Sequence, residues 1–382
     1  MSPLNSIRAS AAVAVTSRAG LAAVARAPVA PPPLFKQALG RFSYGLDPST
    51  RRPWTPAALQ AQMTRSPALT RDVKATLATA KATVGTPLPT LTIMYSEGLL
   101  ASDPRKIKSG AVTRRFPEVY SWAVAARMGP PELQAKAAKA TITTLLSYTA
   151  KYKPTGNPIN EHNFLPMFQA ADLVMPMMTA PQQKAARAWL HSFITAAEHY
   201  PLQGMRKVNN WKTFSLQIRG TAAQALGDTK ALSKTSHELD TLLEATIRAD
   251  GSSLDFHHRD AFHYHLYNSE ALMDLAMYLP GAVSDASKRR IEKTFEFIKP
   301  YYLGQKTHVE FAHSKVAFDR YRATHGEAKY KPHPWNPREA DALLQRARAL
   351  FPSLRPWSQL AEENDAGIRN ELGASMRWPA RG

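Results

Sequence analysis

The sequence predicts an all-α fold built from about ten paired helices in one large domain. Three observations predict it. From about residue 55 onward apolar residues recur at three- and four-residue spacing, most of the 18 Gly and 29 Pro stand between these stretches, and strand-like patterns are sparse. With 382 residues, 44% of them hydrophobic, the chain is long enough to bury a large core. No fixed repeat period is visible, which argues against a regular solenoid.

Two segments show the helical pattern most clearly. Residues 130–152 open on two prolines and end just before another, as is typical of a helix start and stop. Residues 179–201 carry an apolar stripe that includes Trp189 and Phe193. Further helices are expected at 67–84, 114–128, 164–176, 212–226, 229–248, 260–279, 285–300 and 336–350. Only residues 88–96, LPTLTIMYS, have a strand-like pattern.

Charge and cysteine content limit the classes of function. The chain has 49 Lys and Arg against 30 Asp and Glu, a net charge of +19, which indicates a polyanionic partner: nucleic acid, anionic lipid or an acidic polysaccharide. The absence of Cys excludes disulfide scaffolds, thiolate nucleophiles and Cys-ligated zinc. No apolar run approaches the roughly 20 residues of a membrane span. A helical nucleic-acid-binding protein is one alternative, although the basic residues are dispersed and no helix-turn-helix, RRM or KH signature is visible.

The first 34 residues differ from the rest of the chain. They are rich in Ala, Ser and Arg, and the first acidic residue is Asp47. A short apolar run at 11–15 and an A-x-A-like site at 25–27 resemble a secretory signal, although a transit peptide or a misassigned start codon fits almost as well. We expect residues 1–34 to be a leader with a Pro-rich linker, residues 35–382 to form the folded domain, and the protein to be periplasmic or secreted.

The densest group of reactive side chains lies in residues 250–272. It comprises His257, His258, Arg259, Asp260, His263, Tyr264, His265 and Tyr267. A turn leading into a helix start is a place where side chains converge on a ligand, and the helix dipole favours anionic groups there. A single His in such a helix most often packs in the core, but the whole group with an Arg and two Tyr predicts function.

A metal site is the alternative interpretation of this group. His258, His263 and His265, with Asp255 or Asp260, offer nitrogen and oxygen ligands. Their spacing matches neither the H-E-x-x-H motif nor an i, i+4 His pair. A metal-dependent hydrolase therefore stays an alternative without a supporting motif.

Two polar stretches precede predicted helices. Asn209 and Asn210 stand before Trp211, and because one Asn suffices for an N-cap, the second amide is free to point elsewhere. His162 and Asn163 belong to a polar loop whose side chains either form turns or bind a ligand.

Two basic stretches also contain candidate binding residues. Arg114 and Arg115 at a predicted helix start oppose the helix dipole, so a negative partner would explain them. Residues 308–327 contain Lys315 and Arg322, and by themselves they indicate a solvated basic face.

Three of these stretches, in this order, resemble the alginate lyase superfamily of polysaccharide lyases. They are residues 145–174, 208–228 and 249–276. The resemblance implies an (α/α) barrel or toroid that cleaves an acidic polysaccharide, such as alginate or glucuronan, by β-elimination. It also implies an enzyme without a cofactor, with neither nucleic acid nor membrane as partner.

The reaction has three chemical requirements. The C5 carboxylate must be neutralised, a base must remove the C5 proton, and an acid must protonate the departing C4 oxygen. Amides, His and Arg suit the first role, and one Tyr can fill the other two when the proton and the leaving group lie on one face of the sugar. A free Tyr has a pKa near 10, so a catalytic Tyr needs a cation beside it.

The resemblance assigns these roles to individual residues. Tyr264 falls on the family's catalytic Tyr, Arg259 lies near its Arg at a shorter spacing, and Asn209 and Asn210 match its Asn pair. Trp211 stands where the family has a His, so the imidazole is expected from His162, His258 or His265. Expected substrate-binding residues are Asn209, Trp211, His162, Asn163, Arg114, Arg115, Tyr267 and Lys315. A single Tyr acting from one side favours polymannuronate or glucuronan over polyguluronate.

Overall fold

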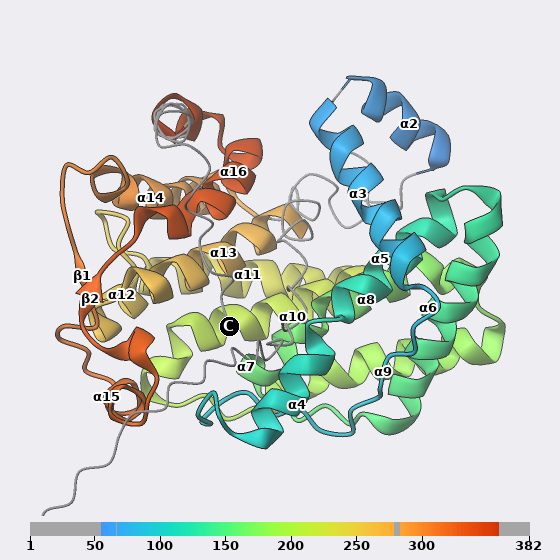
Figure 1. Ribbon diagram of the computed structural model, residues 1–382, viewed down its shortest axis with the longest axis horizontal. Helices are drawn as coiled ribbons and strands as arrows, with labels where there is room; N and C mark the ends of the chain where they lie inside the picture. The colour runs from blue at the N-terminus through green and yellow to red at the C-terminus, as the bar shows by residue number, and fades with distance from the viewer. Residues whose placement is uncertain (1–54, 66, 279–282, 359–382) are drawn as a thin grey trace, which may run out of the picture. The chain divides into compact units, whose positions relative to one another are not determined.

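The computed structural model describes residues 55–65, 67–278 and 283–358, which all belong to one compact unit, Pro33–Ser375 (Figure 1). Within them nearly all regular structure is helical, which confirms the predicted all-α class. The predicted leader, residues 1–34, lies outside the described residues. No helix in the described part is long and apolar enough to cross a membrane.

The helices and strands have the following bounds. The α-helices are α2 (Pro56–Arg65), α3 (Pro67–Thr83), α4 (Pro104–Thr113), α5 (Phe116–Met128), α6 (Pro131–Lys151), α7 (Pro158–Glu161), α8 (Leu165–Val174), α9 (Ala180–His199), α10 (Asn210–Leu226), α11 (Thr229–Thr246), α12 (Leu254–Arg259), α13 (Phe262–Tyr278), α14 (Asp285–Tyr302), α15 (Ala317–Thr324) and α16 (Asp341–Leu350). The 3₁₀ helices are η2 (His162–Phe164), η3 (Met175–Met177), η4 (Gly204–Lys207), η5 (Ala328–Tyr330), η6 (Pro337–Ala340) and η7 (Pro352–Leu354). The strands β1 (Val309–Glu310) and β2 (His333–Pro334) pair antiparallel, with Val309 opposite Pro334 and Glu310 opposite His333.

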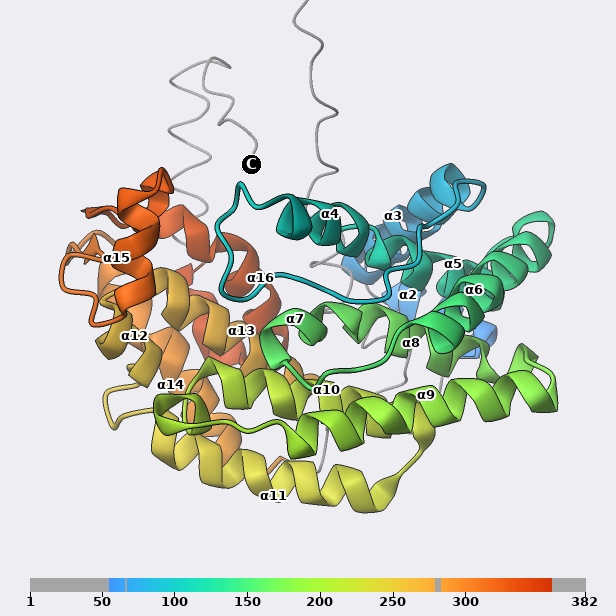
Figure 2. The same ribbon diagram turned by 90° about the horizontal axis from the view of Figure 1, so that it is seen from below.

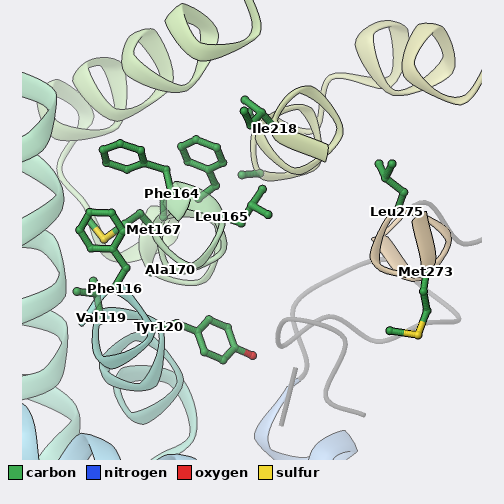
Figure 3. Close-up of a cluster of buried hydrophobic side chains, with 14 of the residues drawn as sticks. Phe116, Val119, Tyr120, Phe164, Leu165, Met167, Ala170, Ile218, Met273 and Leu275 are labelled. Atoms are coloured by element: carbon green, nitrogen blue, oxygen red, sulfur yellow. The ribbon is translucent and has the colours of Figure 1, made fainter. Parts of the chain in front are cut away.

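Alternate helices along the chain form two layers. Helices α5, α8, α10 and α13 pack side by side, and α3, α6, α9, α11 and α14 pack against their outer sides (Figures 2 and 3). Nearly every residue of α10 is buried, whereas α14 buries one face that includes Ile291 and Phe295. Small and apolar residues on all sides of a helix suit an inner position, and an amphipathic helix suits an outer one. This arrangement is compatible with the predicted (α/α) toroid.

An aromatic cluster holds α5 and the 162–174 region together. The ring of Phe164 lies 5.0 Å from Phe116 and 5.8 Å from Trp189, and Figure 3 shows Phe116 and Phe164 facing each other between α5 and α8. All three side chains are buried, and each contributes roughly 1.5–3 kcal/mol of hydrophobic stabilisation. This packing fixes the start of α8, and with it the polar residues His162 and Asn163.

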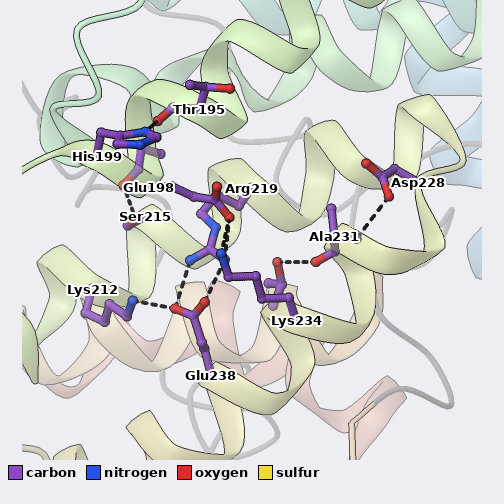
Figure 4. A network of polar contacts seen from close by, with 12 residues as sticks. Thr195, Glu198, His199, Lys212, Ser215, Arg219, Asp228, Ala231, Lys234 and Glu238 are labelled. Carbon is purple, nitrogen blue, oxygen red and sulfur yellow. Dashed lines mark hydrogen bonds and ion pairs between the residues drawn. The ribbon is translucent and has the colours of Figure 1, made fainter.

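A buried cation joins three helices. Arg219 of α10 forms ion pairs with Glu198 of α9 at 3.1 Å and Glu238 of α11 at 2.7 Å (Figure 4). Lys212 and Lys234 add pairs to Glu238 and Glu198 respectively. Because removing one partner would leave buried charge uncompensated, this network fixes the register of α10 between its two outer neighbours.

The strand expected at 88–96 is not formed, and that prediction was wrong. The segment runs as a coil from α3 toward α4 (Figure 2). Its polar groups bond to side chains of other helices: Thr90 Oγ1 lies 2.5 Å from Ser147 Oγ, and Asn160 Oδ1 accepts from the backbone amides of Ser96 and Glu97. These side chains take the hydrogen bonds that a neighbouring strand would otherwise supply.

The helix expected at 260–279 begins after a break at Asp260. Asp260 has a left-handed backbone with φ of 50°, which Asp tolerates better than most residues. Its carbonyl accepts from the Phe311 amide at 2.7 Å and its carboxylate from the His313 amide at 2.8 Å. The break therefore separates α12 from α13 and attaches the 308–313 segment beside it.

Candidate active site

Tyr264 lies in the first turn of α13. The start of that helix is held by Glu310 of β1, whose carboxylate accepts from the amides of Phe262 at 2.6 Å and His263 at 3.1 Å. Burial raises the pKa of Glu310 to about 7, and the two amide donors oppose that rise. Glu310 thus caps the helix from a distant part of the chain and fixes the backbone that carries Tyr264.

Arg259 contacts the face of Tyr264. Its guanidinium carbon lies 3.7 Å from the centroid of the Tyr264 ring, and its Nη1 donates to Asp319 Oδ1 at 2.6 Å. Asp319 is buried, so the guanidinium is held by a carboxylate on one side and by the ring on the other. Arg259 and Tyr264 are therefore close together, as predicted, and the guanidinium contacts the face of the Tyr264 ring.

A second arginine reaches the hydroxyl of Tyr264. Arg322 Nη1 lies 3.4 Å from Tyr264 Oη and 2.9 Å from Tyr330 Oη. Arg322 is only 8% exposed, so the expectation that 308–327 forms a solvated face was wrong for this residue. The i, i+3 spacing of Asp319 and Arg322 on α15 is the signal that could have identified a buried face.

Tyr330 was not identified from the sequence. It is buried beside Tyr264 in a small cluster with Ala261 and Phe311. Burial, together with the neighbouring Tyr264, raises the pKa of Tyr330 well above its ordinary value. Tyr330 therefore stays protonated, and it ends the 3₁₀ helix η5, whose sequence carries no motif.

Asn209 and Asn210 have different surroundings. Asn209 is the N-cap of α10, with its Oδ1 accepting from the Trp211 amide at 3.1 Å. Asn210 donates its backbone amide to Asp255 Oδ2 at 2.9 Å, and burial raises the pKa of Asp255 to about 7. The side chain of Asn210 is 2% exposed, and its Oδ1 has no hydrogen-bond partner among the described residues. One Asn thus caps the helix while the amide of the other keeps unused bonding capacity.

Trp211 is enclosed by other side chains. Its ring lies under Arg206, with the guanidinium carbon 4.0 Å from the centroid, and stacks on Tyr200 at 6.3 Å. Both contacts stabilise the start of α10, and Trp211 is buried. Its expected substrate contact is not visible in this packing and stays a prediction.

His162 and Tyr267 meet although 105 residues separate them in the sequence. Tyr267 Oη lies 3.2 Å from Nε2 of His162, whose Nδ1 faces the Pro158 carbonyl at 3.1 Å. The His162 ring packs at a tilt against Phe214, with 4.3 Å between the ring centroids. His162, Asn163 and Tyr267 line a pocket of about 300 Å³. The Tyr267 ring lies 6.4 Å from that of Tyr264, so this pocket adjoins the tyrosine and arginine cluster.

The histidines of 257–265 diverge. His265 is fully buried, with Nδ1 on Ser253 Oγ at 3.0 Å and Nε2 on the Thr294 carbonyl at 2.8 Å, and burial lowers its pKa to about 4. The structure therefore places His265 in the core, and its expected catalytic role stays a prediction. His257 bonds to Ser252 Oγ at 2.7 Å. His258 is half-buried near Arg259, and burial with that positive charge lowers its pKa.

The metal interpretation depended on His258, His263 and His265 converging, but the His265 ring is buried in the core against Ser253 and the Thr294 carbonyl. In the described part of the chain, no group of three or more His, Asp or Glu side chains is arranged to hold a metal ion.

The basic residues expected to bind substrate are dispersed. Helix α4 ends at Thr113, so Arg114 follows a helix C-terminus, where a cation is favourable. The helix expected from 114 begins two residues later, at Phe116, with Arg115 as its N-cap. Arg115 pairs with Glu118 at 2.9 Å and donates to the carbonyls of Thr86 and Pro87, so its negative partner belongs to its own chain. Lys315 is exposed, and its backbone amide donates to the His258 carbonyl at 2.9 Å.

Comparison with known proteins identifies the family. The family model described as alginate lyase matches residues 117–308, half of the chain, and includes all three stretches that carry the resemblance. Neither the curated proteins nor the solved structures gave a match. The matched region contains Asn210, Arg259 and Tyr264 and ends shortly before Arg322. The chain therefore belongs to the alginate lyase family and is a polysaccharide lyase.

Proposed function

We propose that the protein cleaves an acidic polyuronate, polymannuronate or glucuronan, by β-elimination with Tyr264 as both base and acid. The observation that carries this proposal is the pair of arginines around Tyr264: one guanidinium on the ring face and one at the hydroxyl. A guanidinium that donates to a phenol oxygen stabilises negative charge on it. This is the environment that a tyrosine base requires.

The proton transfers balance on Tyr264 alone. The phenolate removes the C5 proton, the C5 electron pair forms the C4=C5 double bond, and the C4–O4 bond breaks. The phenol then returns the same proton to O4, which regenerates the phenolate. Arg322 stays at the phenol oxygen throughout, because Tyr330 Oη also holds it at 2.9 Å.

Asn210 and His162 are proposed to neutralise the C5 carboxylate. The Oδ1 of Asn210 is buried without a partner among the described residues, and its Nδ2 is the atom that can donate to a carboxylate. Trp211 stands where the family has a His, so another residue has to supply the imidazole. The hydrogen bond between His162 and Tyr267, next to the catalytic tyrosine, supports His162 in that role. His258 is the alternative, whereas the buried position of His265 argues against a substrate contact.

A periplasmic or secreted location is proposed with this activity. It is supported by the signal-like composition of residues 1–34 and by the fact that polymeric uronates are too large to cross a membrane unaided.

The test is an elimination assay on purified protein. Each turnover creates one conjugated C4=C5 double bond, so ultraviolet absorbance is expected to rise with polymannuronate or glucuronan and to stay flat with polyguluronate. A flat response across polymannuronate, mixed alginate, glucuronan and glycosaminoglycans would contradict the proposed substrate class. Chain cleavage that releases reducing ends without a rise in absorbance, disappears with a chelator and returns with Zn²⁺ would favour the metal-dependent hydrolase.

A further inference from the structure

Two phenol hydroxyls share one nitrogen of Arg322. Its Nη1 lies 3.4 Å from the Oη of Tyr264 and 2.9 Å from the Oη of Tyr330. Arg322 is buried, and hydrogen bonds in such a low-dielectric place are stronger than in water. The proposed elimination uses the hydroxyl of Tyr264 as base and acid, whereas the hydroxyl of Tyr330 only holds the guanidinium. Tyr330 therefore lies beside the reacting oxygen with a hydroxyl that the chemistry leaves unused.

A strained residue packs against both tyrosine rings. Phe311 has a left-handed backbone with φ of 60°, which is an outlier for so bulky a side chain. Its amide donates to the Asp260 carbonyl at 2.7 Å, and its ring centroid lies 5.1 Å from that of Tyr330 and 6.1 Å from that of Tyr264. Backbone strain of this kind persists only where the surrounding structure enforces it, and it clusters at functional sites. The fold therefore accepts strain at the point where the two tyrosines meet.

Tyr330 keeps its proton next to Tyr264. Burial, the charge of a Tyr264 phenolate and a hydrogen bond with Tyr264 raise the pKa of Tyr330 well above its ordinary value, and the charge of Arg322 opposes that rise. A phenol that accepts from Arg322 still has its own O–H to donate. The Tyr330 hydroxyl can therefore donate to the Tyr264 oxygen when that oxygen becomes negative.

Charged and titratable groups from several segments surround the two tyrosines. They are Arg259 of α12, His263 and Tyr267 of α13, Asp319 and Arg322 of α15, Glu327 and Lys329 in the segment that follows, and Lys106 of α4. Tyr330 adds a neutral donor to this set. Because a hydrogen bond to an ionised oxygen is roughly twice as strong as one between neutral groups, such a donor favours the phenolate form of Tyr264.

We propose that Tyr330 is a second hydrogen-bond donor to the Tyr264 oxygen, beside Arg322, and that it stabilises the phenolate that begins the elimination. The inference rests on the proposed function and deepens it by one residue. No bond forms or breaks at Tyr330: its proton stays on its own oxygen while Tyr264 takes the C5 proton and returns it to O4. Tyr330 acts through Tyr264 and is a positioning residue.

The pH dependence of turnover tests this role. Tyr330→Phe keeps the ring and removes the donor, so the pH at which kcat/KM reaches half its plateau is expected to rise by about one pH unit. The plateau should fall by less than about threefold, because a phenolate that forms at higher pH is a stronger base. A merely structural role would instead lower kcat/KM by the same factor at every pH, and that result would overturn the proposal.

Tyr148→Phe is the matched control. Tyr148 is buried like Tyr330, and its hydroxyl donates to the Pro89 carbonyl at 3.0 Å, so this variant also removes one hydroxyl from the interior. It is expected to leave the pH profile in place.

A second variant is expected to act in the opposite direction. With 3-fluorotyrosine in place of Tyr330 the O–H is a stronger donor, so the half-plateau pH should fall below that of the parent. This variant also decides the matter if Tyr330→Phe fails to fold. A profile that does not move with the fluorinated residue, or that moves upward, would overturn the assignment.

A titration without substrate separates this inference from the proposed function. In NMR of the full chain with labelled tyrosine, the Tyr264 resonance is identified by its loss in Tyr264→Phe. It is expected to titrate at higher pH in Tyr330→Phe than in the parent. If this change occurs but no polyuronate is cleaved, the proposed elimination fails and the contact from Tyr330 stands. If polyuronates are cleaved and neither the resonance nor the rate profile moves, the assignment of Tyr330 fails and the lyase proposal stands.

Discussion

Arg259 and Tyr264 are five residues apart on two different helices, yet the guanidinium of one lies 3.7 Å above the ring of the other. The left-handed Asp260 between α12 and α13 turns the chain so that this contact forms. Asp319 binds the guanidinium of Arg259, which contacts the face of the Tyr264 ring. The phenol oxygen of Tyr264 is contacted by Arg322 instead. Two cations from distant parts of the chain thus meet at one tyrosine.

Tyr264→Phe is expected to abolish elimination and to leave the fold intact, since it removes one oxygen from a buried ring. The measurement is ultraviolet absorbance with polymannuronate or glucuronan, alongside a circular dichroism melt. Tyr321→Phe, an exposed tyrosine on α15, is the control and is expected to retain activity. Substantial turnover by the Tyr264 variant would show that another residue is the catalytic base, with His258 as the first candidate.

Arg322→Met is expected to lower kcat by on the order of 10²-fold with little change in KM, because the lost charge acts on the phenol oxygen during proton transfer. Arg320→Met, on the same helix but exposed, is the matched control and is expected to change kcat by less than about twofold. Arg322→Lys should recover part of the activity, since it restores the charge but not the fork to Tyr330. An unchanged kcat in Arg322→Met would show that this cation is only structural.

The two neighbouring asparagines are expected to respond differently to alanine. Asn209→Ala removes the N-cap of α10, so the free energy of unfolding should fall by about 1 kcal/mol with turnover nearly kept. Asn210→Ala should instead reduce kcat/KM by about tenfold or more, because its amide is proposed to face the substrate carboxylate. Urea unfolding and initial rates distinguish the two. If Asn209→Ala instead lowered kcat/KM and Asn210→Ala lowered only the stability, Asn209 would be the residue that faces the substrate.

His265 is expected to make the protein sensitive to acid. Burial lowers its pKa to about 4, so between about pH 4 and 6.5 the unfolded chain binds a proton that the native chain does not. The stabilisation that neutral His265 provides is therefore complete above pH 6.5 and is lost as the pH falls toward 4. In urea unfolding, the deficit of His265→Gln relative to the parent should shrink by on the order of 2 kcal/mol across that range. The exposed His191→Gln is the control, and a pH-independent deficit for His265→Gln would contradict the assignment.

The local sequence pattern predicted the fold class of this protein, most of its long helices and its family. Helical spacing and the Pro and Gly positions predicted the all-α class and most of the long helices, because an amphipathic or wholly apolar helix is encoded within its own segment. The ordered stretches around His162, Asn210 and Tyr264 also indicated the family. One of the two neighbouring asparagines was expected as an N-cap, and the structure identifies it as Asn209.

Only the tertiary structure decided which of the candidate side chains meet. His265 and Tyr264 are neighbours in sequence, but successive helix positions point about 100° apart, so one faces the core and the other the arginines. Arg322, Tyr330 and Glu310 come from 46 to 66 residues beyond Tyr264, and no local signal ties them to it. Burial and long-range contact depend on how the whole chain packs. The sequence motif therefore indicated Tyr264 and Arg259, whereas only the fold brings Arg322 to the Tyr264 hydroxyl.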